Sequence, residues 1–240
     1  LVTGCWGNDG NAPDPSALEG VSWVLIEGID VEGWEATAPT VSFGPQRMGG
    51  SSGCNSYGGP YTADGSTLEL GQISSTLIGC PPPVSDVEAA YHSKLDRVAQ
   101  WRIEDDELVL LDADDDEILR FEPASPVGAW NVTGLLRGDA LTSPIAGTEI
   151  TATFTEDGKV SGFAGCNTYR ATYTFDKRAI DITPPAATKR LCATPAGVME
   201  QESLYLDALA RAVRYSYDGK VLGLSKTIGA RVVAFSRVTG

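Results

Sequence analysis

The sequence predicts a mainly β protein made of two tandem copies of a small antiparallel, barrel-like domain, with one helix in each copy. The first observation is an internal repeat, in which Gly53-Cys54-Asn55-Ser56-Tyr57 returns 112 positions later as Gly165-Cys166-Asn167-Thr168-Tyr169. The second is that each copy contains about six short β-prone segments separated by turn residues. The third is one amphipathic stretch ahead of the last three segments. Short strands with a single helix favour a closed antiparallel barrel.

The repeat extends over nearly the whole chain. The offset of 112 relates Tyr61 to Tyr173, Thr76 to Thr188 and Cys80 to Cys192, and an offset of 114 relates Trp101 to Tyr215 and Phe121 to Phe235. A copy of about a hundred residues is long enough to bury its own core. We therefore expect a tether at 1–15, a first domain at 16–123 and a second domain at 124–240.

The strands of the first copy are predicted by β-branched and aromatic residues. They are expected at 21–26, 41–43, 67–70, 76–80, 101–103, 107–111 and 118–121, with a turn at Asp64-Gly65 and a proline stop at Pro81. In the second copy they are expected at 127–132, 150–154, 179–182, 215–217, 221–224 and 232–235. Asp157-Gly158 is typical of a tight hairpin turn, since such turns need positive φ angles.

Each copy also carries the signals of one helix. Ser85 and Glu88 have the spacing of a capping box, and the helix that follows places Val87, Tyr91, Leu95 and Val98 on one side. In the second copy, Thr194 is the expected N-cap and Pro195 suits the first helical position. The apolar side of that helix is expected to consist of Leu206, Leu209 and Val213.

The net charge of −14 argues against nucleic acid as a partner, because phosphate binding needs clustered Lys and Arg. The charge is divided unevenly. Residues 1–123 hold 22 acidic and 5 basic residues, or −17, whereas 124–240 hold 10 and 13, or +3. An acidic surface that keeps the protein soluble explains this division. Attraction between the two halves, or repulsion of anionic surfaces by the first, is the alternative.

Four of the five cysteines lie at matched positions, with the same spacing of 26 in each copy. Disulfides between Cys54 and Cys80 and between Cys166 and Cys192 are expected, because pairing within a copy suits two independent domains. Buried reduced thiols are the alternative. No metal site is expected, since two thiols without a His or acidic residue at ligand spacing cannot complete a tetrahedral zinc site.

The fifth cysteine lies in Leu1-Val2-Thr3-Gly4-Cys5, which resembles the lipobox of bacterial lipoproteins. In such proteins the cysteine sulfur carries the lipid, and the Gly- and Pro-rich run that follows is typical of a flexible tether. The resemblance implies lipidation of Cys5 and an address outside the cytoplasm, where disulfides persist. The alternative is a trimmed chain end with a chance Gly-Cys pair.

The order of these features resembles the META domain, also called the HslJ-like family. The motif residues are Gly53, Cys54, Asn55, Tyr57 and Thr76 in the first copy and Gly165, Cys166, Asn167, Tyr169 and Thr188 in the second. The resemblance covers about 16–123 and 126–240. It implies a small barrel-like β domain, a location in the bacterial envelope, and links to heat-shock response and antibiotic resistance. It does not imply an enzyme, since no catalytic residues are established for the family.

The candidates for catalysis are weak. Gly49-Gly50-Ser51-Ser52-Gly53 fits the Gly-x-Ser-x-Gly pattern of serine hydrolases, but it precedes a predicted strand and the second copy lacks it. His92 is the only histidine and is interpreted as a solvated helix residue beside the apolar side. The acidic run from Asp112 to Glu117 lacks the spacing of an EF-hand and is interpreted as a solvated hairpin turn, although calcium binding stays open.

The remaining polar and aromatic candidates have structural interpretations. Asn55 and Asn167 are expected to satisfy buried backbone groups near a tight turn. The aromatic residues are expected to fill the cores; they are Trp23, Trp101, Tyr57 and Tyr61 with their counterparts in the second copy.

Together these observations predict a non-catalytic, lipid-anchored envelope protein that acts as a binding or stress-protective module. We expect it to be a monomer, to use no cofactor, and to bind an envelope protein. The alternative is a lipocalin-like barrel that carries a small apolar ligand. The barrel interior distinguishes the two, because an apolar cavity of several hundred Å³ favours the carrier and a filled interior favours the module.

Overall fold

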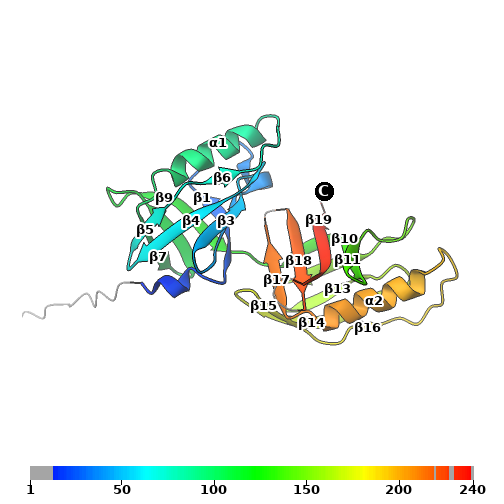
Figure 1. The fold of residues 1–240 in the computed structure, drawn as a ribbon. Helices are drawn as coiled ribbons and strands as arrows, with labels where there is room; N and C mark the ends of the chain where they lie inside the picture. The colour runs from blue at the N-terminus through cyan, green and yellow to red at the C-terminus, as the bar shows by residue number, and fades with distance from the viewer. Residues whose placement is uncertain (1–12, 219, 227–229, 239–240) are drawn as a thin grey trace, which may run out of the picture.

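The computed structural model describes residues 13–218, 220–226 and 230–238 of the 240-residue chain. It is mainly β, and Figure 1 shows two barrels that follow one another along the chain, each with one helix. Within the described ranges, neither helix is long and apolar enough to cross a membrane.

The first domain is built from nine strands and one α-helix. They are β1 (Ser22–Glu27), β2 (Thr40–Phe43), β3 (Arg47–Ser51), β4 (Ser56–Asp64), β5 (Thr67–Leu70), β6 (Ser74–Ser75), α1 (Val84–Leu95), β7 (Gln100–Glu104), β8 (Glu107–Leu111) and β9 (Glu117–Pro123). Short 3₁₀ helices occur at Pro15–Ala17 and Trp34–Thr37.

The second domain repeats this order and adds one strand, β11, which pairs with β10. Its elements are β10 (Gly128–Arg137), β11 (Ala140–Thr142), β12 (Thr151–Thr155), β13 (Lys159–Phe163), β14 (Thr168–Asp176), β15 (Ala179–Ile182), β16 (Ala186–Ala187), α2 (Val198–Ala210), β17 (Arg214–Tyr217), β18 (Val221–Ser225) and β19 (Arg231–Arg237).

Each domain closes into an eight-stranded antiparallel barrel. The first has the order β3-β2-β1-β9-β8-β7-β5-β4 and closes by pairing of β3 with β4. The second has the order β10-β12-β13-β14-β15-β17-β18-β19 and closes by pairing of β10 with β19. The two-residue strands β6 and β16 lie outside the closed circuits, on β4 and β14. Closure leaves each barrel without a long exposed sheet edge.

The thinnest part of each barrel lies at the same place. Only Thr67 and Gln100 pair between β5 and β7, and only Ala179 and Arg214 pair between β15 and β17. Hydrogen bonds from residues just outside these pairs extend both seams, for example from the amide of Leu68 to the carbonyl of Ala99. The shared weak seam indicates that the two domains inherited one architecture.

The barrel interiors are filled by side chains that alternate along the strands. In β5, for example, Leu68 is buried between exposed Thr67 and Glu69. The largest fully buried side chains of the first domain are Trp101, Tyr91, Phe43, Phe121, Leu18, Leu25, Leu68 and Leu95, and those of the second are Trp130, Tyr205, Phe154 and Phe235. They belong to one continuous cluster in each domain. The predicted tandem barrels and aromatic cores are therefore confirmed.

The helix starts differ from the sequence prediction. In α1 the N-cap is Pro83, which makes no side-chain hydrogen bond, so Ser85 lies inside the helix and forms no capping box. In α2 the N-cap is Gly197, with a φ of 82° that favours glycine, and the helix starts three residues after Pro195. Tyr205 rather than Val213 occupies its buried side.

One predicted strand is also wrong. Residues 76–80 have the sequence pattern of a strand, but β6 ends at Ser75. The amide of Thr76 still donates to the carbonyl of Ser56, whereas the chain from Leu77 to Cys80 pairs with no strand. The reason is that side chains rather than a neighbouring strand satisfy the backbone of Ile78, as described below.

The segment between the barrels is packed against both. The amide of Ala124, which is buried, donates to the carbonyl of Ser22 in the first domain. The hydroxyl of Tyr215 in the second domain donates to the carbonyl of Ala124 at 2.6 Å. Two cationic side chains of the second domain also reach the first, Lys220 to the carbonyl of Cys54 and Arg178 to the hydroxyl of Ser22.

Candidate functional site

The most exposed large apolar side chains of the described residues lie in two matched loops. Leu77 is 99% exposed and Ile78 is 62% exposed in the first domain, and Leu191 is 91% exposed in the second. The five other exposed large apolar residues range from 42% to 50%. We call residues 76–80 and 188–192 the disulfide loops, because each ends in a cysteine of the matched pairs.

The predicted disulfides are confirmed. Cys54 is bonded to Cys80 and Cys166 to Cys192, with Cα atoms 6.1 and 6.0 Å apart. Each bond fixes the end of a disulfide loop to the turn that precedes β4 or β14. The loops are therefore tied to the barrel wall at the point where the repeated motif begins.

In each domain, the side-chain amide of a buried asparagine hydrogen-bonds to the backbone of the disulfide loop. In the first domain, the Asn55 Oδ1 accepts hydrogen bonds from the hydroxyl of Thr76 and the amide of Ile78, both at 2.7 Å. The Asn55 Nδ2 donates to the carbonyl of Ile78 and to the carboxylate of Glu88. One side chain thus satisfies both backbone groups of Ile78, which explains why no strand is needed there.

The second domain repeats the arrangement. The Asn167 Oδ1 accepts from the hydroxyl of Thr188 and the amide of Arg190, and its Nδ2 donates to the carbonyl of Arg190 and to Glu202. The amide of Asn167 also donates to the other Glu202 oxygen at 2.7 Å. The structural interpretation of both asparagines is confirmed, and we call each Asn, Thr and Glu set an amide lock.

The glutamates of the locks come from the helices. Glu88 lies in α1 and also accepts a hydrogen bond from the hydroxyl of Ser52. Burial alone would raise the pKa of the Glu88 carboxyl, but hydrogen bonds from Ser52 and Asn55 and the nearby His92 hold its pKa below the usual value. An ionised carboxylate therefore joins helix to barrel at this point.

A pair of tyrosine hydroxyls makes a second link between helix and barrel. The hydroxyls of Tyr57 and Tyr91 lie 2.7 Å apart, as do those of Tyr169 and Tyr205. Tyr57 also donates to the carbonyl of Thr40 inside the barrel. Burial raises the pKa of each of these hydroxyls, so they stay neutral.

Sequence reasoning missed the helix partners of the locks. Glu88 was assigned to a capping box, and Glu202 was given no role. The signal was available, because the offset of 114 relates Glu88 to Glu202 and Tyr91 to Tyr205. Matched buried polar residues in a repeated helix could have been predicted to contact the matched asparagines.

The two loops differ in what they present to solvent. Alignment of the two copies at the offset of 112 places Leu77 opposite Lys189, Ile78 opposite Arg190 and Gly79 opposite Leu191. The first loop is thus apolar and the second carries two cations beside one apolar side chain. The lock is shared, whereas the outward-facing side chains have diverged.

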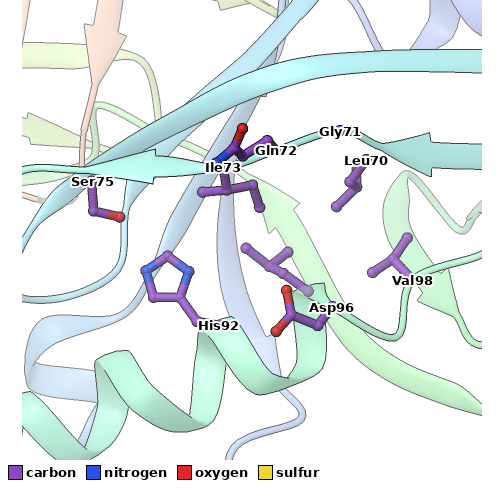
Figure 2. A pocket seen from close by; sticks show the side chains of 9 residues that line it. Leu70, Gly71, Gln72, Ile73, Ser75, His92, Asp96 and Val98 are labelled. Carbon is purple, nitrogen blue, oxygen red and sulfur yellow. The ribbon is translucent and has the colours of Figure 1, made fainter.

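His92 lies in a groove of the first domain rather than in open solvent. Figure 2 shows its ring pointing from α1 toward the segment that contains Ile73 and Ser75. The ring packs edge-on against Tyr57 at 5.5 Å, and its Nε2 lies 3.9 Å from Glu88. His92 is a helix residue as expected, but its ring is only partly exposed, because Tyr57 of the barrel packs against it.

Both hydroxyls of the serine pattern make local hydrogen bonds at the end of β3. Ser51 is buried at the end of β3, where its hydroxyl accepts from the amide of Gly53. Ser52 donates to Glu88 and to the carbonyl of Asn55. Neither hydroxyl hydrogen-bonds to His92, and the carboxylate that Ser52 contacts, Glu88, is also held by the side-chain amide of Asn55.

The acidic run forms the turn between β8 and β9. Asp112 is buried, accepts from the amides of Asp114 and Asp116, and pairs with Arg97. Burial alone would raise the pKa of the Asp112 carboxyl, but these hydrogen bonds lower it. In the described part of the chain, no group of three or more His, Cys, Asp or Glu could hold a metal ion. Cys5 lies outside the described residues.

Comparisons with known proteins agree with the duplication. The family model of the META domain matches the chain twice, over residues 16–125 and 126–239. No curated protein matches. Similar solved structures include a protein from Burkholderia xenovorans, 25% identical with a TM-score of 0.37, covering 52% of this chain and 99% of that one. A duf4847 family protein from Bacteroides vulgatus is 20% identical with a TM-score of 0.33, covering 47% and 94%.

Replacement of Asn167 by alanine should destabilise the second domain alone. The variant leaves Glu202, Thr188 and the backbone of Arg190 without their partner, which costs about 2–4 kcal/mol. In calorimetry of the full chain, one of two unfolding transitions should fall by roughly 10 °C. Asn55→Ala should lower the other transition. Loss of less than about 1 kcal/mol in both variants would contradict the lock.

Removal of the second disulfide should have a similar local effect. The double variant Cys166→Ala, Cys192→Ala opens a loop of spacing 26 and should cost roughly 3 kcal/mol through the entropy of the unfolded chain. Urea unfolding followed by the fluorescence of Trp130 reports on the second domain if the other tryptophans are replaced by phenylalanine. An unchanged urea midpoint would show that the bond constrains nothing.

Proposed function

The chain belongs to the META domain family in both of its halves, and from this membership and the loop geometry we propose a non-catalytic binding module of the bacterial envelope. The module acts as a monomer and presents the two disulfide loops to a partner protein. Its role is protection under stress, in line with the links of the family to heat-shock response and antibiotic resistance.

One observation carries this proposal: fully exposed leucines stand on loops that cannot rearrange freely. Leu77 and Leu191 are 99% and 91% exposed, yet a disulfide and an amide lock fix the backbone beside each. A flexible loop would lose conformational entropy on binding, whereas a rigid loop has lost it already. Exposed apolar side chains on a preorganised backbone are typical of protein-docking surfaces.

The polar groups of the structure support a non-catalytic role. Two of the carboxylates with lowered pKa values, Glu88 and Asp112, are engaged by hydrogen bonds inside the fold. His92 lies 3.9 Å from Glu88, and Tyr57 packs edge-on against its ring. A general acid and base would need to converge on one open site, and these groups are instead used to hold loops and turns.

The alternative of a ligand-carrying barrel is less well supported. Trp101, Tyr91 and Phe121 fill the first interior, and Trp130, Tyr205 and Phe235 fill the second, all below 2% exposure. A carrier needs an apolar cavity large enough for its ligand. The filled interiors favour contact through the outer surface.

The disulfides indicate an extracytoplasmic protein, because such bonds persist in oxidising compartments. We further propose that a lipid at Cys5 anchors it to the membrane, followed by a tether that ends near Pro15. Two or more acyl chains would suffice for stable anchoring.

The docking role predicts that the loops bind the partner and other exposed apolar residues do not. The triple variant Leu77→Ser, Ile78→Ser, Leu191→Ser should lose most crosslinked partner in pull-downs from envelope extracts. Its melting temperature should change by little, since the replaced side chains are exposed. The matched control is Leu204→Ser with Val213→Ser, which are 42% and 50% exposed elsewhere. Equal capture by both variants would refute docking through the loops.

The anchor predicts a change of cell fraction. In cells that make the precursor, Cys5→Ala should move the protein from the membrane fraction to the soluble envelope fraction. Intact mass of the wild type should exceed the mass of the chain from Cys5 by that of its acyl chains. An unmodified mass would rule out the anchor and leave the docking loops unaffected.

A further inference from the structure

The first domain has a groove on its surface. The groove has a volume of about 480 Å³ and lies between α1 and the segment that leads into β6. This volume is within the range of ligand sites. Figure 2 shows Gln72, Ile73 and Ser75 on one side, with His92 and Asp96 pointing toward them from the helix.

One wall of the groove borders an unpaired strand edge. Ser74 and Ser75 of β6 pair with Gly58 and Tyr57 of β4, and within the described residues β6 has no other strand neighbour. The amide of Thr76 donates to the carbonyl of Ser56. Because hydrogen-bonded and non-bonded pairs alternate, Ile73 and Ser75 turn their backbone groups away from β4, and both line the groove.

The opposite wall supplies a free carboxylate. Asp96 is exposed, and its carboxylate forms no hydrogen bond or ion pair with any described residue. The other nearby carboxylate, Glu88, is held by Ser52 and Asn55 and faces His92. Residues 1–123, which include this domain, carry a net charge of −17. This distribution favours a cationic side chain beside Asp96.

The second domain provides an internal comparison. Leu206 stands where the first domain has His92, Ala210 where it has Asp96, and Ala187 where it has Ser75. Leu206 and Ala187 pack against the hydrophobic core of their domain. The three polar residues are thus a property of the first copy and are not required by the shared fold.

From this geometry we propose that the groove binds an extended segment of a partner protein that carries a Lys or Arg side chain. The segment adds a strand to the free edge of β6, through the backbone groups of Ile73 and Ser75. Its cationic side chain pairs with Asp96. The site is separate from the disulfide loops, and it does not depend on their role.

The test uses the full chain and a synthetic peptide, acetyl-Thr-Val-Lys-Val-Thr-amide, followed by NMR titration. We expect saturable shifts of the amides of Ile73, Ser75 and His92. Asp96→Asn should weaken binding about threefold or more, because an exposed ion pair is lost. Asp86→Asn, on the same helix outside the groove, should leave the affinity unchanged.

Two further peptides separate strand addition from simple charge attraction. A version with Glu in place of Lys should bind more weakly. Of two peptides that are N-methylated at alternate sets of backbone amides, only one should lose binding, because only one set of amides faces β6. Absence of saturable shifts with the Lys peptide would overturn the proposal. Equal binding of the Glu peptide, or no effect of Asp96→Asn, would overturn it as well.

Discussion

The rest of each domain depends on one buried side-chain amide. Asn55 and Asn167 connect three parts that are distant in sequence: the barrel wall, the disulfide loop and the helix. A buried polar group is costly unless every donor and acceptor is paired, so the network forms completely or not at all. The position of the helix and the conformation of the loop are therefore set together. This coupling lets a loop of exposed side chains remain ordered.

Much of the fold could be predicted from the sequence because the same pattern of residues occurs in both copies. The ranges of β5, β8 and β15 agree with the periodicity of their residues. The predicted capping box of α1 is wrong because a capping pattern is local, whereas the structure depends on a tertiary contact. The Glu88 carboxylate accepts a hydrogen bond from Asn55 and does not turn back to the start of its own helix. Residues 76–80 failed for a related reason. Their pattern is that of a strand, but a side chain from another turn binds the backbone.

Comparison of the two copies distinguishes the residues that the fold requires from those that can vary. The cysteines, the asparagines, the helix glutamates and the paired tyrosines are present in both copies and contact one another. The residues that face outward differ, as Ile78 and Arg190 do at equivalent positions. The repeat shows in the sequence which residues are shared, and the structure shows which of the shared side chains contact one another. The shared residues contact one another inside the fold, and the residues that differ lie on the surface.

The short junction between the barrels has a consequence for enzymatic cleavage. A protease must draw several residues of its substrate into an extended, unbound conformation before it can cut. Ala124 has its amide bonded to one barrel and its carbonyl to the other, and prolines stand on both sides at 123 and 126. The midpoint that looks like a natural place to divide the protein is thus a poor substrate. Digestion of the native molecule should begin elsewhere and leave the two barrels joined.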